Sequence, residues 1–147
     1  MAWNIGLALA AVLLINGLIF LVNPQEMSSD RQTPLTPPGY IIGLVWIGLF
    51  ICMGLARWKL VGSGEGGAAS AAPIVWLAAL CLAYPVYTGG LRNEAIGLIG
   101  NVVTLLFTLG VIVFIFPKSR AAAFLTLPIA IWLTYATFLT ALSVRSL

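Results

Sequence analysis

Five long apolar runs, separated by short polar or glycine- and proline-containing segments, dominate the pattern of the chain. Each run has the roughly 17 to 22 residues that a helix needs to cross the hydrocarbon core of a bilayer, and none alternates polar and apolar residues as a barrel strand does. The pattern therefore predicts an all-α integral membrane protein, a bundle of five transmembrane helices forming one domain over residues 1–147. The expected helices are residues 3–22, 39–58, 72–88, 95–116 and 121–142.

The segments between the runs have the composition of water-exposed connections. The first is polar and rich in proline, residues 62–67 form a glycine-serine linker, and two short turns follow at 89–93 and 117–120. The first run is too long for a signal peptide and lacks a preceding basic segment and a small-residue cleavage pattern, so we expect it to be retained. Five spans place the termini on opposite sides, and four Lys/Arg against three favour a cytoplasmic N-terminus only weakly.

Composition supports a membrane protein, since 61% of the residues are hydrophobic, only 7% are charged, and the mean hydropathy is +1.09. The net charge of +3 comes from loop ends that suit anionic lipid headgroups, so we expect a lipid bilayer and no nucleic acid as partner. Arg57, Trp58 and Lys59 have the pattern of an interfacial anchor. Cys52 and Cys81 lie within spans, and we interpret them as small packing residues.

The ionisable residues exclude several classes of chemistry. The chain has no histidine, and its four acidic residues, Glu26, Asp30, Glu65 and Glu94, fall in loops or at a helix end. A proton-coupled pump, a histidine-ligated haem protein and an acid-base enzyme are therefore poorly supported. We predict no catalytic residue, no metal site and no required cofactor.

Aromatic and small residues form one face on each of two predicted helices. These faces consist of Gly43, Trp46, Phe50 and Gly54, and of Pro128, Trp132, Tyr135, Ala136 and Leu139 with Thr140 beside them. Each holds a tryptophan too deep for the interfacial belt. Periodicity leaves core packing and ligand binding equally open for both. The spacing of Gly39 and Gly43 also permits close approach of another helix.

Two motifs resemble a known family. Thr36-Pro37-Pro38-Gly39-Tyr40, followed by Gly43, Val45-Trp46, Met53-Gly54 and Ala56, resembles the signature of the TspO/MBR family, the tryptophan-rich sensory proteins that include the mitochondrial translocator protein. The segment LPIAIWLTYATFLT, residues 127–140, resembles the family's PY..W...AT.LN segment. The resemblance covers essentially the whole chain.

The resemblance implies a five-helix bundle, often a homodimer, with a cavity that opens toward the first loop. The ligands it implies are hydrophobic small molecules: porphyrins and other tetrapyrroles, sterols, and isoquinoline or benzodiazepine drugs. A flat macrocycle suits such a cavity because it gains from apolar burial and ring stacking. The predicted ligand-binding residues are Trp46 and Trp132 as pocket tryptophans, Pro37, Pro38 and Gly39 at the loop-to-helix junction, Ala136 on the fifth helix, Tyr84 or Tyr87 in place of a third-helix aromatic, and Phe50 and Tyr135 on the same faces.

The chain also departs from the family's pattern. Leu35 stands where a loop tryptophan usually lies, Ile129 and Thr140 replace the tyrosine and asparagine of the fifth helix, and the third helix lacks its asparagine. These changes predict other ligand preferences. A sterol-contact pattern occurs at residues 82–92, and its reverse at 120–127, but such patterns are common by chance in membrane sequences.

We therefore expect a multi-pass membrane protein that binds a tetrapyrrole- or sterol-like ligand as a sensor, regulator or carrier. Because no organelle presequence precedes the first span, a bacterial cell membrane is the expected location. Two alternatives remain at this point. One is light-dependent porphyrin modification, attributed to some members of the family. The other is a structural or assembly role without a ligand, through the glycine faces of Gly39/Gly43 and Gly97/Gly100.

Overall fold

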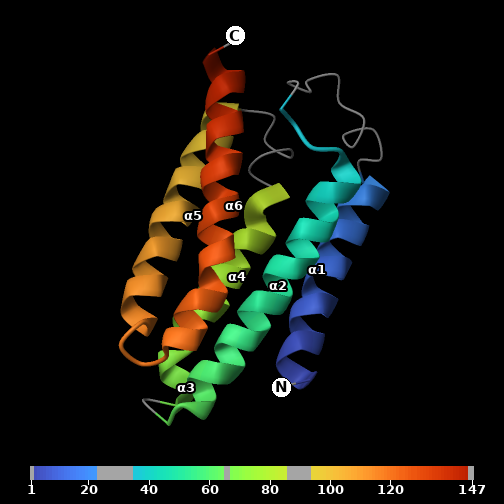
Figure 1. Ribbon diagram of the computed structural model, residues 1–147. Helices are drawn as coiled ribbons and strands as arrows, with labels where there is room; N and C mark the ends of the chain where they lie inside the picture. The colour runs from blue at the N-terminus through green and yellow to red at the C-terminus, as the bar shows by residue number, and fades with distance from the viewer. Residues whose placement is uncertain (1, 23–34, 65–66, 86–93, 146–147) are drawn as a thin grey trace.

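The computed structural model describes residues 2–22, 35–64, 67–85 and 94–145, and all regular secondary structure in these ranges is helical (Figure 1). Five long helices are present, the number that the apolar runs predict. They are α1 (Ala2–Val22), α2 (Gly39–Gly62), α4 (Ala72–Pro85), α5 (Glu94–Ile115) and α6 (Arg120–Arg145). A four-residue helix, α3 (Gly67–Ser70), precedes α4.

The helix boundaries differ from the prediction mainly around the glycine-serine linker. Helix α2 continues four residues beyond the expected end at position 58, because Leu60 is fully buried and holds the last turn in the core. The helix ends where Ser63 donates both its N–H and its hydroxyl to the Leu60 carbonyl and Gly64 takes a φ of 76°, a left-handed conformation that glycine adopts without strain. The expected residues 86–88 of the third span lie outside the described ranges.

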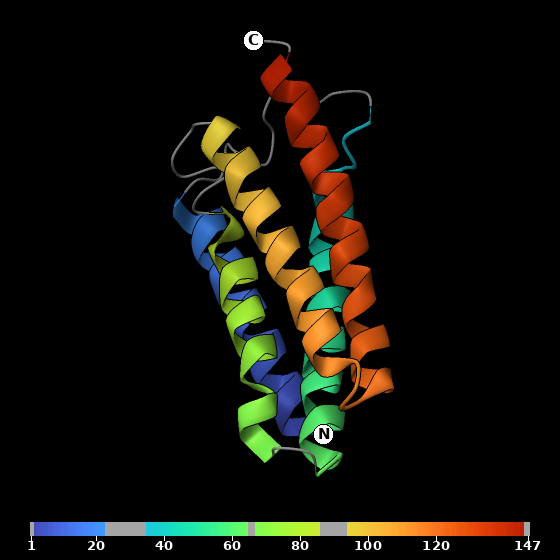
Figure 2. The same cartoon turned by 90° about the vertical axis from the view of Figure 1, so that its left-hand side faces the viewer.

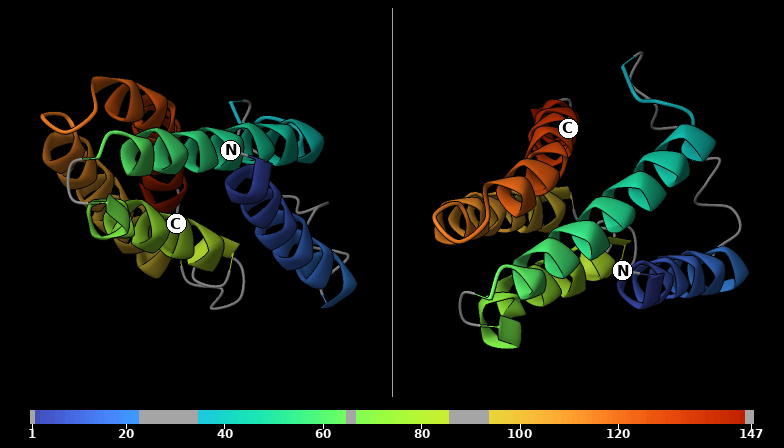
Figure 3. Two further views of the ribbon diagram at one scale, coloured as in Figure 1. Left: turned by 90° about the horizontal axis from the view of Figure 1, so that it is seen from below. Right: turned by 60° about the horizontal axis from the view of Figure 1, so that its bottom comes forward.

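The five long helices form a ring in the order α1, α2, α6, α5, α4 (Figures 2 and 3). The contact between α5 and α6 is the most extensive, whereas α1 packs mainly on α2 and touches α4 only lightly. Helix α1 begins and α6 ends at opposite ends of the bundle, as five spans require (Figure 1). The end of α2, helix α3 and the α5–α6 turn lie at the end where α1 begins. The ring is therefore closed least tightly between α1 and α4.

Small, polar and β-branched residues fill the buried face of α5. This stripe consists of Gly97, Asn101, Thr104, Thr108, Val111 and Ile115, at helical spacings of three and four. The Thr104 hydroxyl donates to the Gly100 carbonyl at 2.8 Å, and the Thr108 hydroxyl donates to the Thr104 carbonyl at 2.7 Å. Because these two hydroxyls are satisfied within their own helix, they add no unpaired donor to the closely packed face.

The outer surface of the bundle is strongly apolar. Val113, Ile131 and Trp76 keep 73%, 70% and 67% of their surface exposed. Helix α2, residues 95–115 of α5 and residues 120–144 of α6 are long and apolar enough to cross a membrane, and Ile5–Leu14 and Ala68–Tyr84 are shorter apolar helical stretches. Apolar patches of this extent mark a lipid- or protein-covered surface, which agrees with an integral membrane protein.

One expectation about helix packing is not met within a single chain. A Cβ atom added at Gly43 would meet nothing within 4 Å in the described part of the chain, so no neighbouring helix approaches α2 closely there. The buried face of α2 instead passes through Trp46, Phe50 and Met53, whose large side chains set the distance to the adjacent helices. The Gly43 position is therefore open on the face of α2.

Candidate functional site

A cavity of about 270 Å³ lies between α2, α4, α5, α6 and the extended segment that precedes α2. Among the described residues that line it, none carries a formal charge. Four aromatic residues contribute to the wall, namely Trp46, Tyr84, Trp132 and Tyr135. The remaining lining residues are small, aliphatic or hydroxyl-bearing: Thr36, Pro37, Ile42, Gly97, Ala136, Leu139, Thr140 and Ser143. Such a wall suits an apolar ligand that a few hydrogen bonds can orient.

Trp46 forms the α2 side of this cavity and is held between two other rings. Its ring centroid lies 5.4 Å from that of Tyr84 on α4, with planes tilted by 52°. Phe50, one turn further along α2, places its centroid 6.2 Å from Trp46. Both distances are within the range of favourable aromatic pairs. Because Trp46 is also buried, its orientation is set by packing before any ligand arrives.

Trp132 and Tyr135 form the α6 side. They lie three positions apart on one helical face, and their ring centroids are 5.7 Å apart. Trp132 is only partly buried, so its ring has more freedom than that of Trp46. Ala136 follows on the same face, and its small side chain leaves room between the aromatic residues.

The segment before α2 closes one side of the cavity. Proline at 37 and 38 keeps the chain extended, and Pro38, with φ −54° and ψ 144°, is the N-cap of α2. The N–H groups of Ile41 and Ile42 donate to the Pro38 carbonyl at 2.9 and 3.2 Å, which starts the helix at Gly39. The Tyr135 hydroxyl donates to the Leu35 carbonyl at 2.5 Å and fastens this segment to α6.

A buried amide stands behind the cavity wall and was not predicted as part of the site. Asn101 on α5 is fully buried, and its Nδ2 donates to the Thr140 hydroxyl oxygen at 3.1 Å. The Thr140 hydroxyl in turn donates to the Ala136 carbonyl at 2.9 Å, and the Tyr84 side chain also hydrogen-bonds to Asn101. Oδ1 of Asn101 has no hydrogen-bond partner in the described part of the chain. The signal available in the sequence was a single amide in the middle of an apolar span, which usually faces the bundle interior.

The structure brings together six of the predicted ligand-binding residues: Pro37, Trp46, Tyr84, Trp132, Tyr135 and Ala136 all line the cavity. Phe50 contacts the Trp46 ring but lines a second cavity between α1, α2 and α4. Pro38 and Gly39 position the junction without lining the cavity. Tyr87 lies outside the described residues, and so do residues 23–34 of the first loop. The ligand-binding role of the six residues stays a prediction.

The chain is similar to one known protein family over nearly its whole length. A search among curated proteins found no match. The TspO/MBR family matches residues 4–145, a range that includes both resembling motifs and all five long helices almost completely. A match over nearly the full length cannot arise from one shared motif, and the chain therefore belongs to the TspO/MBR family.

Proposed function

We propose that this protein binds a flat, hydrophobic aromatic ligand of the tetrapyrrole class between Trp46 and Trp132 and acts as a sensor, regulator or carrier. Membership of the TspO/MBR family supports a membrane protein that binds a ligand or senses one. One observation carries the proposal further. Two tryptophans from helices far apart in the sequence line the same cavity, together with two tyrosines and, in the part of the chain that the structure describes, no charged side chain.

In this proposal all five long helices cross the bilayer, including α1 and α4. The exposed apolar side chains support contact with lipid around the bundle. A bacterial cell membrane is the proposed location, and a homodimer is the proposed assembly. The open face of α2 at Gly43 offers a surface where a second copy can pack closely.

Ring stacking and apolar burial would supply the binding free energy. Each aromatic contact contributes about 0.5–1.5 kcal/mol beyond the area it buries. Hydroxyl groups of Thr36, Thr140 and Ser143 line the same cavity and can orient polar substituents at the ligand's edge. The volume of about 270 Å³ is near the lower end, about 300 Å³, of pockets that take drug-sized ligands. A macrocycle would therefore insert one edge unless the wall moves outward.

In this proposal the wall that moves is the segment that precedes α2. Among the described contacts, the hydrogen bond from Tyr135 to Leu35 ties this segment directly to α6. A ligand that enters past Thr36 and Pro37 would displace the segment and weaken that bond. Occupancy of the cavity would then shift residues 35–37 away from α6, which provides a signal for a sensor or a gate for a carrier.

Tryptophan fluorescence of the purified full chain, titrated with protoporphyrin IX, tests this proposal. We expect saturable quenching in the unaltered protein and loss of most of it in a Trp46→Phe, Trp132→Phe double variant. Trp76→Phe is the matched control, because Trp76 is exposed on α4 and lines neither cavity. Quenching that is unchanged in the double variant, or lost equally in the control, would reject the pocket.

A further inference from the structure

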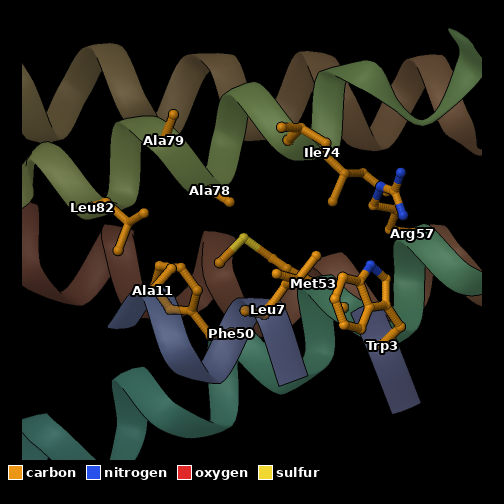
Figure 4. A pocket seen from close by; sticks show the side chains of 13 residues that line it. Trp3, Leu7, Ala11, Phe50, Met53, Arg57, Ile74, Ala78, Ala79 and Leu82 are labelled. Atoms are coloured by element: carbon orange, nitrogen blue, oxygen red, sulfur yellow. The ribbon is translucent and has the colours of Figure 1, made fainter. Parts of the chain in front are cut away.

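A second cavity, of about 430 Å³, lies between α1, α2 and α4 (Figure 4). Within the described ranges it shares no lining residue with the cavity of Trp46 and Trp132, and it occupies the part of the ring where α1 contacts α4 only lightly. Its volume falls within the range of roughly 300–1,000 Å³ typical of ligand pockets. The function proposed above makes no use of this space.

The polarity of the second cavity changes from one end to the other. Arg57, with Trp3 beside it, lies at one end, and Leu82 and Ala11 lie at the opposite end (Figure 4). Between them the wall consists of apolar side chains, with Met53 at the centre. Of the described residues that line the cavity, Arg57 is the only one with a formal charge. The cavity thus has one cationic end and a long apolar remainder.

The long axis of this cavity follows the helices. Ile74 and Leu82 are eight positions apart on α4, which corresponds to about 12 Å along the helix axis. Arg57 lies in the last two turns of α2, and α2 ends at the same end of the bundle as the α5–α6 turn (Figure 1), so the charge lies near the water-facing connections. The apolar part runs from there toward the middle of the bundle.

We propose that this cavity binds a single-chain anionic amphiphile of the long-chain carboxylate class. The carboxylate lies against Arg57, and the hydrocarbon chain lies along Met53, Ala78 and Leu82. A guanidinium presents five N–H donors in a planar fork that matches a carboxylate. Arg57 therefore has enough donors to bind the ligand and to keep the interaction that it already makes within the chain. A neutral chain of equal length would leave the cation without this partner. The site is therefore selective for charge as well as for apolar length.

Binding of a long-chain carboxylate and of the alcohol of equal chain length, both to the full chain in detergent, tests the site. Both ligands enter the micelle, so their difference reports the charged end. We expect the carboxylate to bind about ten-fold or more tightly, since a hydrogen bond to a charged group contributes that much to an affinity. The readouts are the ligand-induced rise in melting temperature and the number of bound molecules in native mass spectrometry.

Variants test whether Arg57 causes the preference for the carboxylate over the alcohol. Arg57→Gln should reduce the preference for the carboxylate to about two-fold or less, because the amide retains donors but not the charge. Lys59→Gln is the matched control, since Lys59 lies on the same helical turn but its ammonium stacks 4.9 Å from the Trp58 ring centroid and lines no part of the cavity. Ala78→Phe fills the apolar part and should abolish binding of both ligands.

The outcomes separate this site from the tryptophan cavity. Trp46→Phe, Trp132→Phe should leave carboxylate binding unchanged, and Ala78→Phe should leave protoporphyrin quenching unchanged. Equal affinity for carboxylate and alcohol in the unaltered protein would overturn the proposal even if Ala78→Phe failed to fold. So would a carboxylate preference that survives Arg57→Gln, or an anionic phospholipid that co-purifies at this site and is not displaced by the carboxylate.

Discussion

The Tyr135 hydroxyl donates a hydrogen bond to the Leu35 carbonyl at 2.5 Å, across 100 positions of the sequence. This bond fastens the end of the first connection to α6 and holds Thr36 and Pro37 at the cavity wall. Leu35 stands where the family usually has a tryptophan. A backbone carbonyl can accept this bond whatever side chain it carries, so the fastening is independent of that substitution.

Without the Tyr135 hydroxyl, the segment before α2 should move away from the cavity wall more often. Tyr135→Phe keeps the ring that packs on Trp132 and loses only the hydrogen bond, at a cost of about 0.5–1.5 kcal/mol. We expect protoporphyrin to associate and dissociate faster, with a smaller change in affinity. Stopped-flow fluorescence measures both rates. Tyr40→Phe is the control, because Tyr40 is an exposed tyrosine near the start of α2; equal effects of the two variants would contradict this role of Tyr135.

The two cavity tryptophans should differ in what they contribute to stability. Trp46 is buried between Tyr84 and Phe50, so Trp46→Ala leaves a cavity in the core and should lower the free energy of unfolding by about 3 kcal/mol or more. Trp132 is partly exposed, so Trp132→Ala should lower the free energy of unfolding by clearly less. Reversible unfolding in detergent compares them. If both cost the same, Trp132 contributes to the core more than its exposure indicates.

Filling the cavity from α6 should block the ligand and spare the fold. Ala136→Leu places three extra carbons in a space of about 270 Å³ where a ligand is proposed to stack. We expect at least a ten-fold loss of protoporphyrin affinity and little change in melting temperature. Ala121→Leu, at an exposed position of the same helix, should change neither. Retained affinity in Ala136→Leu would place the ligand elsewhere.

The hydrogen bond from Asn101 to Thr140 should stabilise the packing of α5 against α6. Thr140→Val keeps the side-chain shape but removes the oxygen that accepts from Asn101 Nδ2. Because polar contacts between membrane helices contribute about 0.6–2 kcal/mol, we expect a loss of that size in the free energy of unfolding. A double-mutant cycle with Asn101→Ala isolates the pair, and additive effects would mean that the two residues act independently.

The open glycine of α2 offers a test of the proposed homodimer. Gly43→Ala adds a methyl group into open space within one chain and should stabilise the helix by about 0.5–1 kcal/mol. Gly43→Leu should disrupt a dimer that packs on this face but not the monomer fold. Light scattering after size exclusion measures the mass. Gly48→Leu is the control, since Gly48 is also an open position on α2; a dimer that persists in Gly43→Leu uses another face.

Much of the architecture followed from the chain alone, because lipid imposes a simple rule. A backbone that crosses a bilayer must satisfy its own hydrogen bonds, so apolar runs of sufficient length can only be helices. Two motifs with unusual spacing were enough to point to the family. The helical faces also placed Trp46 with Phe50 and Trp132 with Tyr135 correctly, since neighbours three and four positions apart always share a face.

Relations between helices could not be read in the same way. Periodicity within α2 put Trp46 and Phe50 on one face, but the packing of α4 against that face divides them, so Trp46 borders one cavity and Phe50 another. Asn101 became a partner of Thr140 and Tyr84 only because α5, α6 and α4 meet around it. Spacing along one helix determines which side chains share a direction, whereas the rotation and distance of the neighbouring helices determine what they face. The sequence by itself therefore determined the class, the number of helices and the family, and the tertiary structure decided which residues enclose each cavity.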